Sequence, residues 1–305
     1  MGPTASGKTD LVATLHERFN VELISVDAAQ VYRGMNIGTA KPDQHFLERY
    51  PHHLIDIKDP DEYYSAAEFR VDATRLIRDI HGRGKLPVLV GGTMFYFSAL
   101  EKGLSDLPAS DDIVRSEIET ELERHGLSNL YQRLVEVDPV MAQRINHKDQ
   151  QRVLRALEIY RITGSPPSVV MARSRLIGLN SPIVKLALFT TNRRTLHHRI
   201  KLRFDLMMEE GLIDEVKGLL GSFQCSDQMP SMRTVGYRQP IEYLRGNLTE
   251  KEMIDSSVAA TRQLAKRQLT WLRQQSNVVW FDISGQKSES VSRYMEANPL
   301  LLKII

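Results

Sequence analysis

Residues 2–9 read Gly-Pro-Thr-Ala-Ser-Gly-Lys-Thr and match the phosphate-loop (P-loop) pattern G-x-x-x-x-G-K-[ST]. In such a loop the backbone N–H groups point at phosphate oxygens, and the helix that follows adds the positive end of its dipole. The Lys8 ammonium can reach a terminal phosphate, and the Thr9 hydroxyl suits an octahedral Mg²⁺ ion. The motif therefore predicts a site for phosphate groups and Mg²⁺. The alternative is a chance glycine-rich turn.

Two further polar residues follow apolar runs that have the length of strands. Asp27 comes directly after the run 22–26, and Thr93 follows the glycine pair after the run 86–90. Ligands of parallel sheets bind at the carboxyl ends of the strands, so we expect both residues beside the P-loop. Asp27 could hold Mg²⁺ through water, act as a general base, or only cap a turn. Thr93 supplies a hydroxyl or caps the next helix.

The remaining candidate ligands are not spaced for metal binding. The pairs His52-His53 and His197-His198 lack the spacing of metal ligands on a helix. Cys225 is the single cysteine, which excludes an internal disulfide and a multi-thiolate metal site and fits a reducing, cytoplasmic location. The longest apolar runs are strand-sized, so we expect no membrane span, and we expect no signal peptide.

The elements that must position these residues alternate between apolar strands and amphipathic helices, a pattern typical of a parallel sheet. Strands are expected at 22–26, 54–57, 86–90, 184–189 and 278–282, and helices after Lys8 and across 65–83, 93–102, 195–210 and 249–274. The predicted class is α/β, with a P-loop NTPase-like parallel sheet core flanked by helices.

Residues 109–183 read differently, because their apolar pattern is only helical. Three helices are expected there, the last of them ended by Gly164. We therefore predict a catalytic core of residues 1–108 and 184–305 and an all-helical insertion domain of residues 109–183.

One expected element has no counterpart in the sequence. A P-loop normally follows a strand, and only Met1 precedes this one. Either the sequence is truncated at this end, or the sheet folds without that central strand.

The net charge is only +2, but the charges are clustered. Residues 101–138 hold ten acidic and four basic side chains, whereas residues 144–175 hold seven basic and two acidic ones. Residues 191–203 hold five basic side chains and residues 262–273 hold four, with no acid in either segment. Any one cluster could be a solvated helix face, but three basic clusters favour RNA or DNA as a partner.

Taken together, the motifs resemble the tRNA dimethylallyltransferase (tRNA isopentenyltransferase) family. They are in family order and span most of the chain. Besides the P-loop they are residues 23–27 (LISVD), 32–42 (YRGMNIGTAKP), 91–96 (GGTMFY), 149–158 (DQQRVLRALE), 233–238 (RTVGYR) and 259–273 (AATRQLAKRQLTWLR).

The resemblance implies transfer of a dimethylallyl group from dimethylallyl diphosphate to N6 of the adenosine at tRNA position 37, with release of diphosphate. Asp27 matches the family's catalytic aspartate, a general base, and Thr93 matches a catalytic position. The implied partners are the anticodon stem-loop, gripped by the insertion domain, and the prenyl diphosphate. A monomer with no membrane partner is expected.

The implied binding residues form two sets. The diphosphate set, with Mg²⁺ at Thr9, is Gly2, Pro3, Thr4, Ala5, Ser6, Gly7, Lys8, Thr9 and Arg203. The tRNA set is Asp27, Ala28, Ala29, Gln30, Thr93, Arg115, Gln151, Arg152, Val153, Leu154, Arg155, Arg233, Thr234, Val235, Gly236, Tyr237, Arg238, Lys266, Arg267, Gln268, Leu269, Thr270, Trp271, Leu272 and Arg273.

Three other functions remain open at this point. A kinase of nucleosides or small metabolites would use the same P-loop for ATP, but it would not explain the helical insertion or the basic clusters. An adenylate isopentenyltransferase, which prenylates free adenine nucleotides, would not need an RNA-gripping insertion. A non-enzymatic RNA-binding module would leave the P-loop and Asp27 unused.

Overall fold

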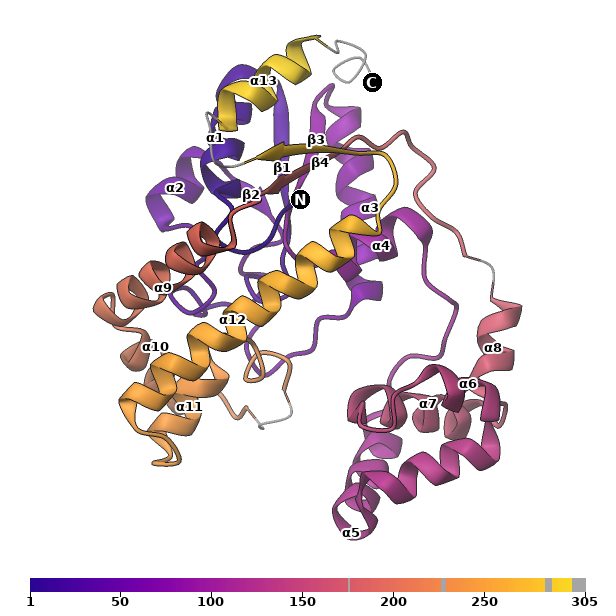
Figure 1. Ribbon diagram of the computed structural model, residues 1–305. Coiled ribbons are helices and arrows are strands. Elements are labelled where there is room, and N and C mark those ends of the chain that lie inside the picture. Colours follow the sequence, from indigo (N-terminus) through magenta and orange to yellow (C-terminus); the bar gives the residue numbers. More distant parts are fainter. Residues whose placement is uncertain (175, 226–228, 283–286, 298–305) are drawn as a thin grey trace. The chain divides into compact units, whose positions relative to one another are not determined.

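The structure, a computed structural model, describes residues 1–174, 176–225, 229–282 and 287–297 (Figure 1). The chain divides into two compact units, and each is described by itself. The first unit comprises residues 1–101 and 179–305, and the second comprises residues 102–178, a few residues ahead of the predicted bounds at 109 and 183. Within the described ranges, no helix has the length and apolar character needed to cross a membrane.

The first unit contains two parallel sheets, and the predicted α/β class is confirmed. One sheet has three strands in the order β2-β1-β3, formed by His52–His53, Val21–Val26 and Leu86–Gly91 (Figure 1). The other pairs β4 (Lys185–Phe189) with β5 (Val278–Asp282). In β1 five of the six residues are buried, as expected for an apolar run covered on both faces.

The strand predicted at residues 54–57 is wrong, because β2 is confined to His52–His53. Leu54 and Asp56 have φ angles of 65° and 54°, in the left-handed region, so the chain turns out of the extended conformation directly after β2. The Asp56 and Ile57 amides then donate hydrogen bonds to the backbone of the loop that follows β1. This apolar run thus forms a turn and not a strand.

Helices surround these sheets. In the first unit they are α1 (Lys8–Arg18), α2 (Gln44–Arg49), α3 (Ala66–Gly82), α4 (Met94–Lys102), α9 (Arg193–Glu209), α10 (Leu212–Ser222), α11 (Arg238–Leu244), α12 (Glu250–Arg273) and α13 (Lys287–Ala297). Capping boxes begin α3 at Ser65 and α12 at Thr249, where the side chain of the residue at the third helical position bonds back to the cap.

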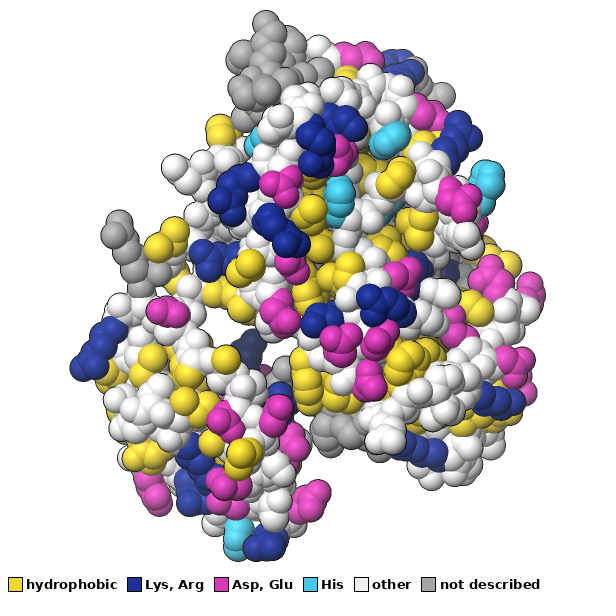
Figure 2. Space-filling model, turned by 180° about the vertical axis from the view of Figure 1, so that it is seen from behind, with side chains coloured by type: hydrophobic (Ala, Val, Ile, Leu, Met, Phe, Trp, Pro, Cys, Tyr) yellow, Lys and Arg dark blue, Asp and Glu magenta, His cyan; other side chains and the backbone are white. Residues whose placement is uncertain are grey.

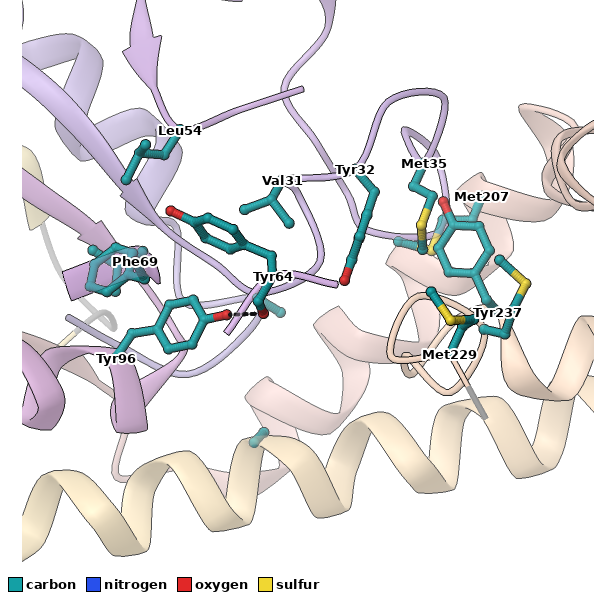
Figure 3. Packing of buried hydrophobic residues seen from close by; sticks show 14 of the residues in the cluster. Val31, Tyr32, Met35, Leu54, Tyr64, Phe69, Tyr96, Met207, Met229 and Tyr237 are labelled. Carbon is teal, nitrogen blue, oxygen red and sulfur yellow. Dashed lines mark hydrogen bonds between the residues drawn. The ribbon is translucent and has the colours of Figure 1, made fainter. Parts of the chain in front are cut away.

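The main core of the first unit packs around the loop that follows β1 (Figure 3). Val31 and Tyr32 of that loop are 1% exposed, and the Tyr96 hydroxyl donates to the Tyr64 carbonyl oxygen at 3.1 Å. The rings of Phe69 and Tyr96 stack with centroids 4.5 Å apart. This packing fixes the backbone that leads away from Asp27.

The second unit, over its described residues 102–174 and 176–178, contains helices and no strands. They are α5 (Asp112–Val137), α6 (Pro139–Arg144), α7 (Gln150–Thr163) and α8 (Pro167–Arg173). Gly126, with φ 76° and ψ 162°, bends α5 into two segments, and the predicted end of α7 at Gly164 is confirmed. Leu130, Leu134 and Val153 are fully buried at the centre of this unit's own core.

A slot separates the two sheets of the first unit. β3 and β4 are both edge strands, and together they line a cavity of about 220 Å³. Met1 enters this slot: its amine donates to the Leu186 carbonyl oxygen at 2.8 Å, and the Leu188 amide donates to the Met1 carbonyl oxygen at 2.9 Å. This is the hydrogen-bond pattern of parallel strands, because Met1 bonds to Leu186 and to Leu188, the residues on either side of Ala187. Met1 thus lies at the position where a strand is expected from the P-loop motif.

Candidate active site

The P-loop wraps around the start of α1. Ala5 and Gly7 have φ angles of 61° and 74°, and these left-handed residues turn the chain twice before the helix begins at Lys8. The Lys8 ammonium donates to the carbonyl oxygens of Gly2 and Pro3 at 3.0 and 2.8 Å, which folds its side chain over the loop. The loop, the lysine and the positive end of α1 therefore converge.

Positive charge is concentrated at this loop. Burial lowers the pKa of Lys8 from 10.5 to about 8; the charge of Asp27 opposes this effect and that of Arg203 adds to it. Burial also lowers the pKa of Arg203, whose guanidinium lies 3.4 Å from the Thr4 hydroxyl. A bound anion would relieve both shifts, because it would interact favourably with two partly desolvated cations.

Two hydroxyl groups of the loop, those of Ser6 and Thr9, are candidates to contact a ligand. The Ser6 side chain is 1% exposed, and its Oγ has no hydrogen-bond partner among the described residues. A Cβ added at Gly2 would lie 2.7 Å from that oxygen, so a larger residue at position 2 would clash with the Ser6 hydroxyl. Thr9, in the first turn of α1, is exposed. The Thr9 oxygen is therefore open to phosphate or a hydrated cation, whereas the Ser6 oxygen is a buried hydroxyl left without a partner in the described residues.

Asp27 lies at the carboxyl end of β1 and turns the chain. Its Oδ1 accepts hydrogen bonds from the Ala29 and Gln30 amides at 2.9 and 3.3 Å. Burial raises the pKa of the Asp27 carboxyl, and the two amides, Lys8 and Lys41 only partly offset this effect. The carboxylate thus caps a turn, one of the roles predicted for it, and in addition becomes more basic than an exposed one.

Thr93 supports the same turn from the end of β3. Its Oγ1 accepts a hydrogen bond from the Ala28 amide at 3.0 Å, and its own amide donates to the Val26 carbonyl oxygen at 3.1 Å. A Cβ at Gly91 would lie 2.0 Å from that same carbonyl oxygen, so only glycine permits the approach. Thr93 therefore orients the backbone on both sides of Asp27.

The loop beyond Asp27 is held by a residue that sequence reasoning missed. The Glu215 carboxylate of α10 accepts hydrogen bonds from the amides of Asn36, Ile37 and Gly38 at 2.7–3.1 Å and from the Tyr237 hydroxyl at 2.6 Å. Gln30 bonds to the same loop, because its amide donates to the Ala40 carbonyl oxygen at 3.3 Å. No local signal marks Glu215, which lies far along the chain from its partners.

Tyr237 was expected to contact tRNA, but its side chain is fully buried. A Cβ at Gly38 would lie 2.6 Å from the Tyr237 ring, and one at Gly236 would lie 2.3 Å from the Gly38 carbonyl oxygen, so the two segments pack tightly. Thr234 and Val235 are half-buried, whereas Arg233 and Arg238 are exposed. Of the segment 233–238, the two arginines are the side chains open to a polyanion.

The segment 266–273 of α12 also divides into two faces. Gln268 and Leu272 point inward, and Leu269 is half-buried against the core. The exposed side chains are Lys266, Arg267, Thr270, Trp271 and Arg273. None of the basic residues among them forms an ion pair with a described residue, and the outward face of α12 is therefore positively charged and free.

Basic side chains of the second unit behave differently. The Arg155 guanidinium lies 2.7 Å from the Glu158 carboxylate and donates to the Pro108 carbonyl oxygen. Arg161 lies 2.6 Å from Glu121, and Arg115 contacts Glu119 at 3.3 Å. The cluster at 144–175 thus serves in part to join α7 to the acidic α5. Basic and acidic side chains are likewise interspersed on the face turned away from the view of Figure 1 (Figure 2).

The other predicted contacts of α7 lie on two sides of that helix. Gln151 and Arg152 are exposed, Leu154 is half-buried and Val153 belongs to the core of the second unit. A valine that is fully buried cannot contact RNA through its side chain.

Comparison with known proteins gives one family. Residues 30–275 match the model of the IPP transferase family. A tRNA dimethylallyltransferase of Legionella pneumophila is 52% identical over 282 residues, covering 92% of this chain and 90% of that protein. One of Nitrosococcus oceani is 51% identical over the same length, with the same coverage.

Solved structures agree. The tRNA isopentenylpyrophosphate transferase of Bacillus halodurans is 40% identical, with a TM-score of 0.70 over 99% of this chain and 95% of that one. A eukaryotic dimethylallyltransferase acting on tRNA is 28% identical, with a TM-score of 0.81 over 98% of this chain and 78% of that one. On the family model, the relatives and the shared fold, this chain belongs to the IPP transferase family of tRNA dimethylallyltransferases.

Proposed function

We propose that the protein transfers a dimethylallyl group from dimethylallyl diphosphate to N6 of the adenosine at tRNA position 37 and releases diphosphate. The observation that carries the proposal is that Asp27, a half-buried carboxyl with a raised pKa, lies within electrostatic reach of the P-loop lysine. An acceptor that must lose a proton and a leaving group that carries negative charge need these two groups side by side. The names of the relatives and solved structures supply the substrate class.

Asp27 serves as the general base. The N6 lone pair of adenine is delocalised into the ring, so N6 becomes a better nucleophile as its proton is removed. In the reaction the C–N bond to the prenyl carbon forms, the C–O bond to diphosphate breaks, and diphosphate leaves with that electron pair. The Asp27 carboxylate takes the N6 proton, for which a raised pKa is an advantage. Its bonds to the Ala29 and Gln30 amides hold it in place.

The P-loop stabilises the leaving group. Lys8, Arg203 and the loop amides lie where negative charge develops on diphosphate as the C–O bond breaks. The unpartnered Ser6 hydroxyl can donate to a phosphate oxygen. In this role the phosphates are a leaving group and are not passed to the acceptor, which distinguishes the reaction from that of a kinase.

A Mg²⁺ ion fits this site through few protein ligands. No group of three or more His, Cys, Asp or Glu side chains within the described ranges could hold a metal by itself. Mg²⁺ is commonly bound by one or two protein oxygens together with substrate phosphates and water, and the exposed Thr9 hydroxyl is such an oxygen. When bound, the ion would neutralise charge on the diphosphate.

The exposed bases of α12, together with Arg233 and Arg238, are proposed to contact the phosphate backbone of the anticodon stem-loop. The target adenine lies in a loop, so it can be turned out of its stack and read on its edge. The second unit is proposed to grip the stem-loop through Arg152 and Gln151, which are exposed.

We further propose that the protein is a cytoplasmic monomer. The cytoplasmic location is in keeping with its single free cysteine, Cys225.

Incubation with labelled dimethylallyl diphosphate, Mg²⁺ and a tRNA with adenosine at position 37 tests the proposal. Label on the tRNA supports it, and label only on free AMP, ADP or ATP would assign the chain to the adenylate enzymes.

The role of Asp27 is tested by Asp27→Asn, because its remaining oxygen can still accept the hydrogen bonds from the amides of the turn. We expect kcat to fall by about 10²-fold or more, with RNA affinity unchanged. Asp43→Asn, which alters the helix cap of α2, is the matched control. Unchanged kcat in Asp27→Asn would remove the residue from the role of base.

A further inference from the structure

Gln268 is the one polar side chain of the 266–273 segment that points into the protein. It is 9% exposed and lies on α12 between the exposed Arg267 and the half-buried Leu269. Its Oε1 accepts a hydrogen bond from the Thr4 amide of the P-loop at 2.9 Å. Its Nε2 donates to the Gly92 carbonyl oxygen at 2.8 Å. Both ends of the amide are therefore used, and each end contacts a different part of the candidate active site.

These contacts join three elements that lie far apart in the sequence. Thr4 belongs to the diphosphate loop, and its hydroxyl also faces Arg203. Gly92 directly precedes Thr93, which orients the backbone beside Asp27. A Cβ at Gly92 would lie 2.5 Å from the Gln268 Nε2, so the amide is packed closely against the glycine. Movement of α12 would displace the P-loop and this turn together.

The outward face of the same helix is the surface that we assign to tRNA. Lys266 and Arg267, two positions and one position before Gln268, are exposed and form no ion pair with any residue in the described ranges. Trp271, one turn later, is 37% exposed. RNA bound there would contact α12 within a turn of the inward amide. One helix thus carries the polyanion surface on one face and a P-loop contact on the other.

We propose that Gln268 is a positioning residue that couples tRNA binding to diphosphate binding. This inference rests on the function proposed above. RNA on the outer face of α12 holds the helix in place, and Gln268 then holds the Thr4 amide and the turn at Gly92 in the geometry that receives diphosphate. Coupling between two ligands is reciprocal, so diphosphate also strengthens RNA binding by the same factor.

The test measures the Kd of inorganic pyrophosphate with Mg²⁺ by calorimetry, with and without a saturating anticodon stem-loop RNA. In the wild-type protein we expect the RNA to tighten pyrophosphate binding by about 5-fold or more. Gln268→Met keeps the volume but removes both hydrogen bonds. We expect it to weaken pyrophosphate binding by about 10-fold, to abolish the RNA effect, and to leave the Kd of the RNA alone within about 2-fold, because the exposed bases remain.

Two further variants make the result specific. Gln263→Met makes the same change at an exposed site of α12 and should behave as wild type. Gln268→Glu keeps an acceptor for Thr4 and, when ionised, cannot donate to Gly92, so under conditions in which it is ionised it should lose the RNA effect with its fold intact.

Three outcomes would overturn the inference. If Gln268→Met weakens RNA binding as strongly as Lys266→Ala does, Gln268 acts at the RNA surface. If pyrophosphate and RNA bind to the wild-type protein without affecting each other, the coupling is absent while the proposed function stands. If the stem-loop RNA does not bind at all, the proposed function fails and the inference fails with it.

Discussion

The slot between β3 and β4 leads to a prediction about stability. All five apolar residues of β3, Leu86–Val90, are only half-buried, although strands of a parallel sheet covered on both faces are normally fully buried. The lining of the cavity beside them includes Leu11, Val12 and Leu15 of α1 as well as Ile77 and Phe97. Met1 forms the first rung of a parallel ladder with β4. An extended apolar segment joined to the Met1 nitrogen would continue that ladder.

The perturbation is a five-residue extension of alternating valine and isoleucine, joined by a peptide bond to the Met1 nitrogen. Burial of each such side chain contributes roughly 2 kcal/mol, ordering each residue costs about 1.5 kcal/mol, and each new backbone hydrogen bond adds about 1 kcal/mol. With three such bonds the net gain is about 5 kcal/mol, which corresponds to a rise in Tm of about 10 °C. A Gly-Ser extension of equal length has no apolar side chains to bury and should give no rise.

The Met1 amine provides a second readout. Burial lowers its pKa from 8.0 to about 5, and the charge of Lys8 adds to the effect. Between these pH values the unfolded state binds the proton more tightly, so this group makes stability increase as pH rises from about 5 to 8. Either extension turns the amine into an amide and should remove that part of the pH dependence, as should acetylation of Met1.

Thermal unfolding of the four proteins from pH 5 to 8 provides the comparison, and hydrogen exchange locates the change. In the valine-isoleucine variant the amides of β3 and the Leu186 amide should become protected. Equal Tm values for the two extensions, or unchanged exchange at Leu186, would refute the reasoning that the slot accepts a strand.

Three other predictions concern single side chains. The pKa of Glu22 is lowered from 4.5 to about 2 by its contacts with Arg83, His53 and Lys85. In urea unfolding, Glu22→Gln should therefore be less stable than wild type at pH 7, and the difference should vanish as pH falls from about 4.5 to 2. A difference that does not depend on pH would contradict this. Glu215→Gln exchanges an acceptor of the loop amides for a donor and should lower kcat/KM by about 10-fold, whereas the exposed Glu209→Gln should not. Lys266→Ala should weaken RNA binding and reduce its log–log salt slope by about 1, whereas Arg161→Ala should leave that slope unchanged and lower stability.

The elements that position the site were predictable where local signals were strong. The apolar runs of β1 and β3, the glycines and lysine of the P-loop and the capping boxes are all encoded within a few residues. The misplaced strand at 54–57 shows the limit of this reasoning. Leu54 and Asp56 are ordinary residues in a left-handed conformation that is fixed by bonds to the loop after β1, and no local pattern records such bonds.

Charge counting along the sequence has a similar limit. The segments 144–175 and 262–273 both read as basic clusters, yet Arg155 and Arg161 are paired with acids of their own unit. The bases of α12 have no such partners within the described ranges. A basic cluster therefore indicates a surface for a polyanion only if its side chains are not paired with acidic residues of neighbouring elements. Which acidic residues are neighbours depends on the fold.

The segment 266–273 shows why the site itself was only partly predictable. Resemblance to the family marks the whole segment for tRNA, but a helix turns its residues through 100° each, so neighbours in the sequence face opposite directions. Lys266 faces outward, and Gln268 bonds to Thr4, which lies 264 residues away. One helix can therefore serve both substrates, since its outward bases meet a large polyanion while its inward amide holds the loop that takes a small one. The P-loop alone is compatible with ATP. Its bond to Gln268 on an RNA-facing helix, together with the half-buried Asp27 carboxyl nearby, favours the interpretation that the loop holds a departing diphosphate.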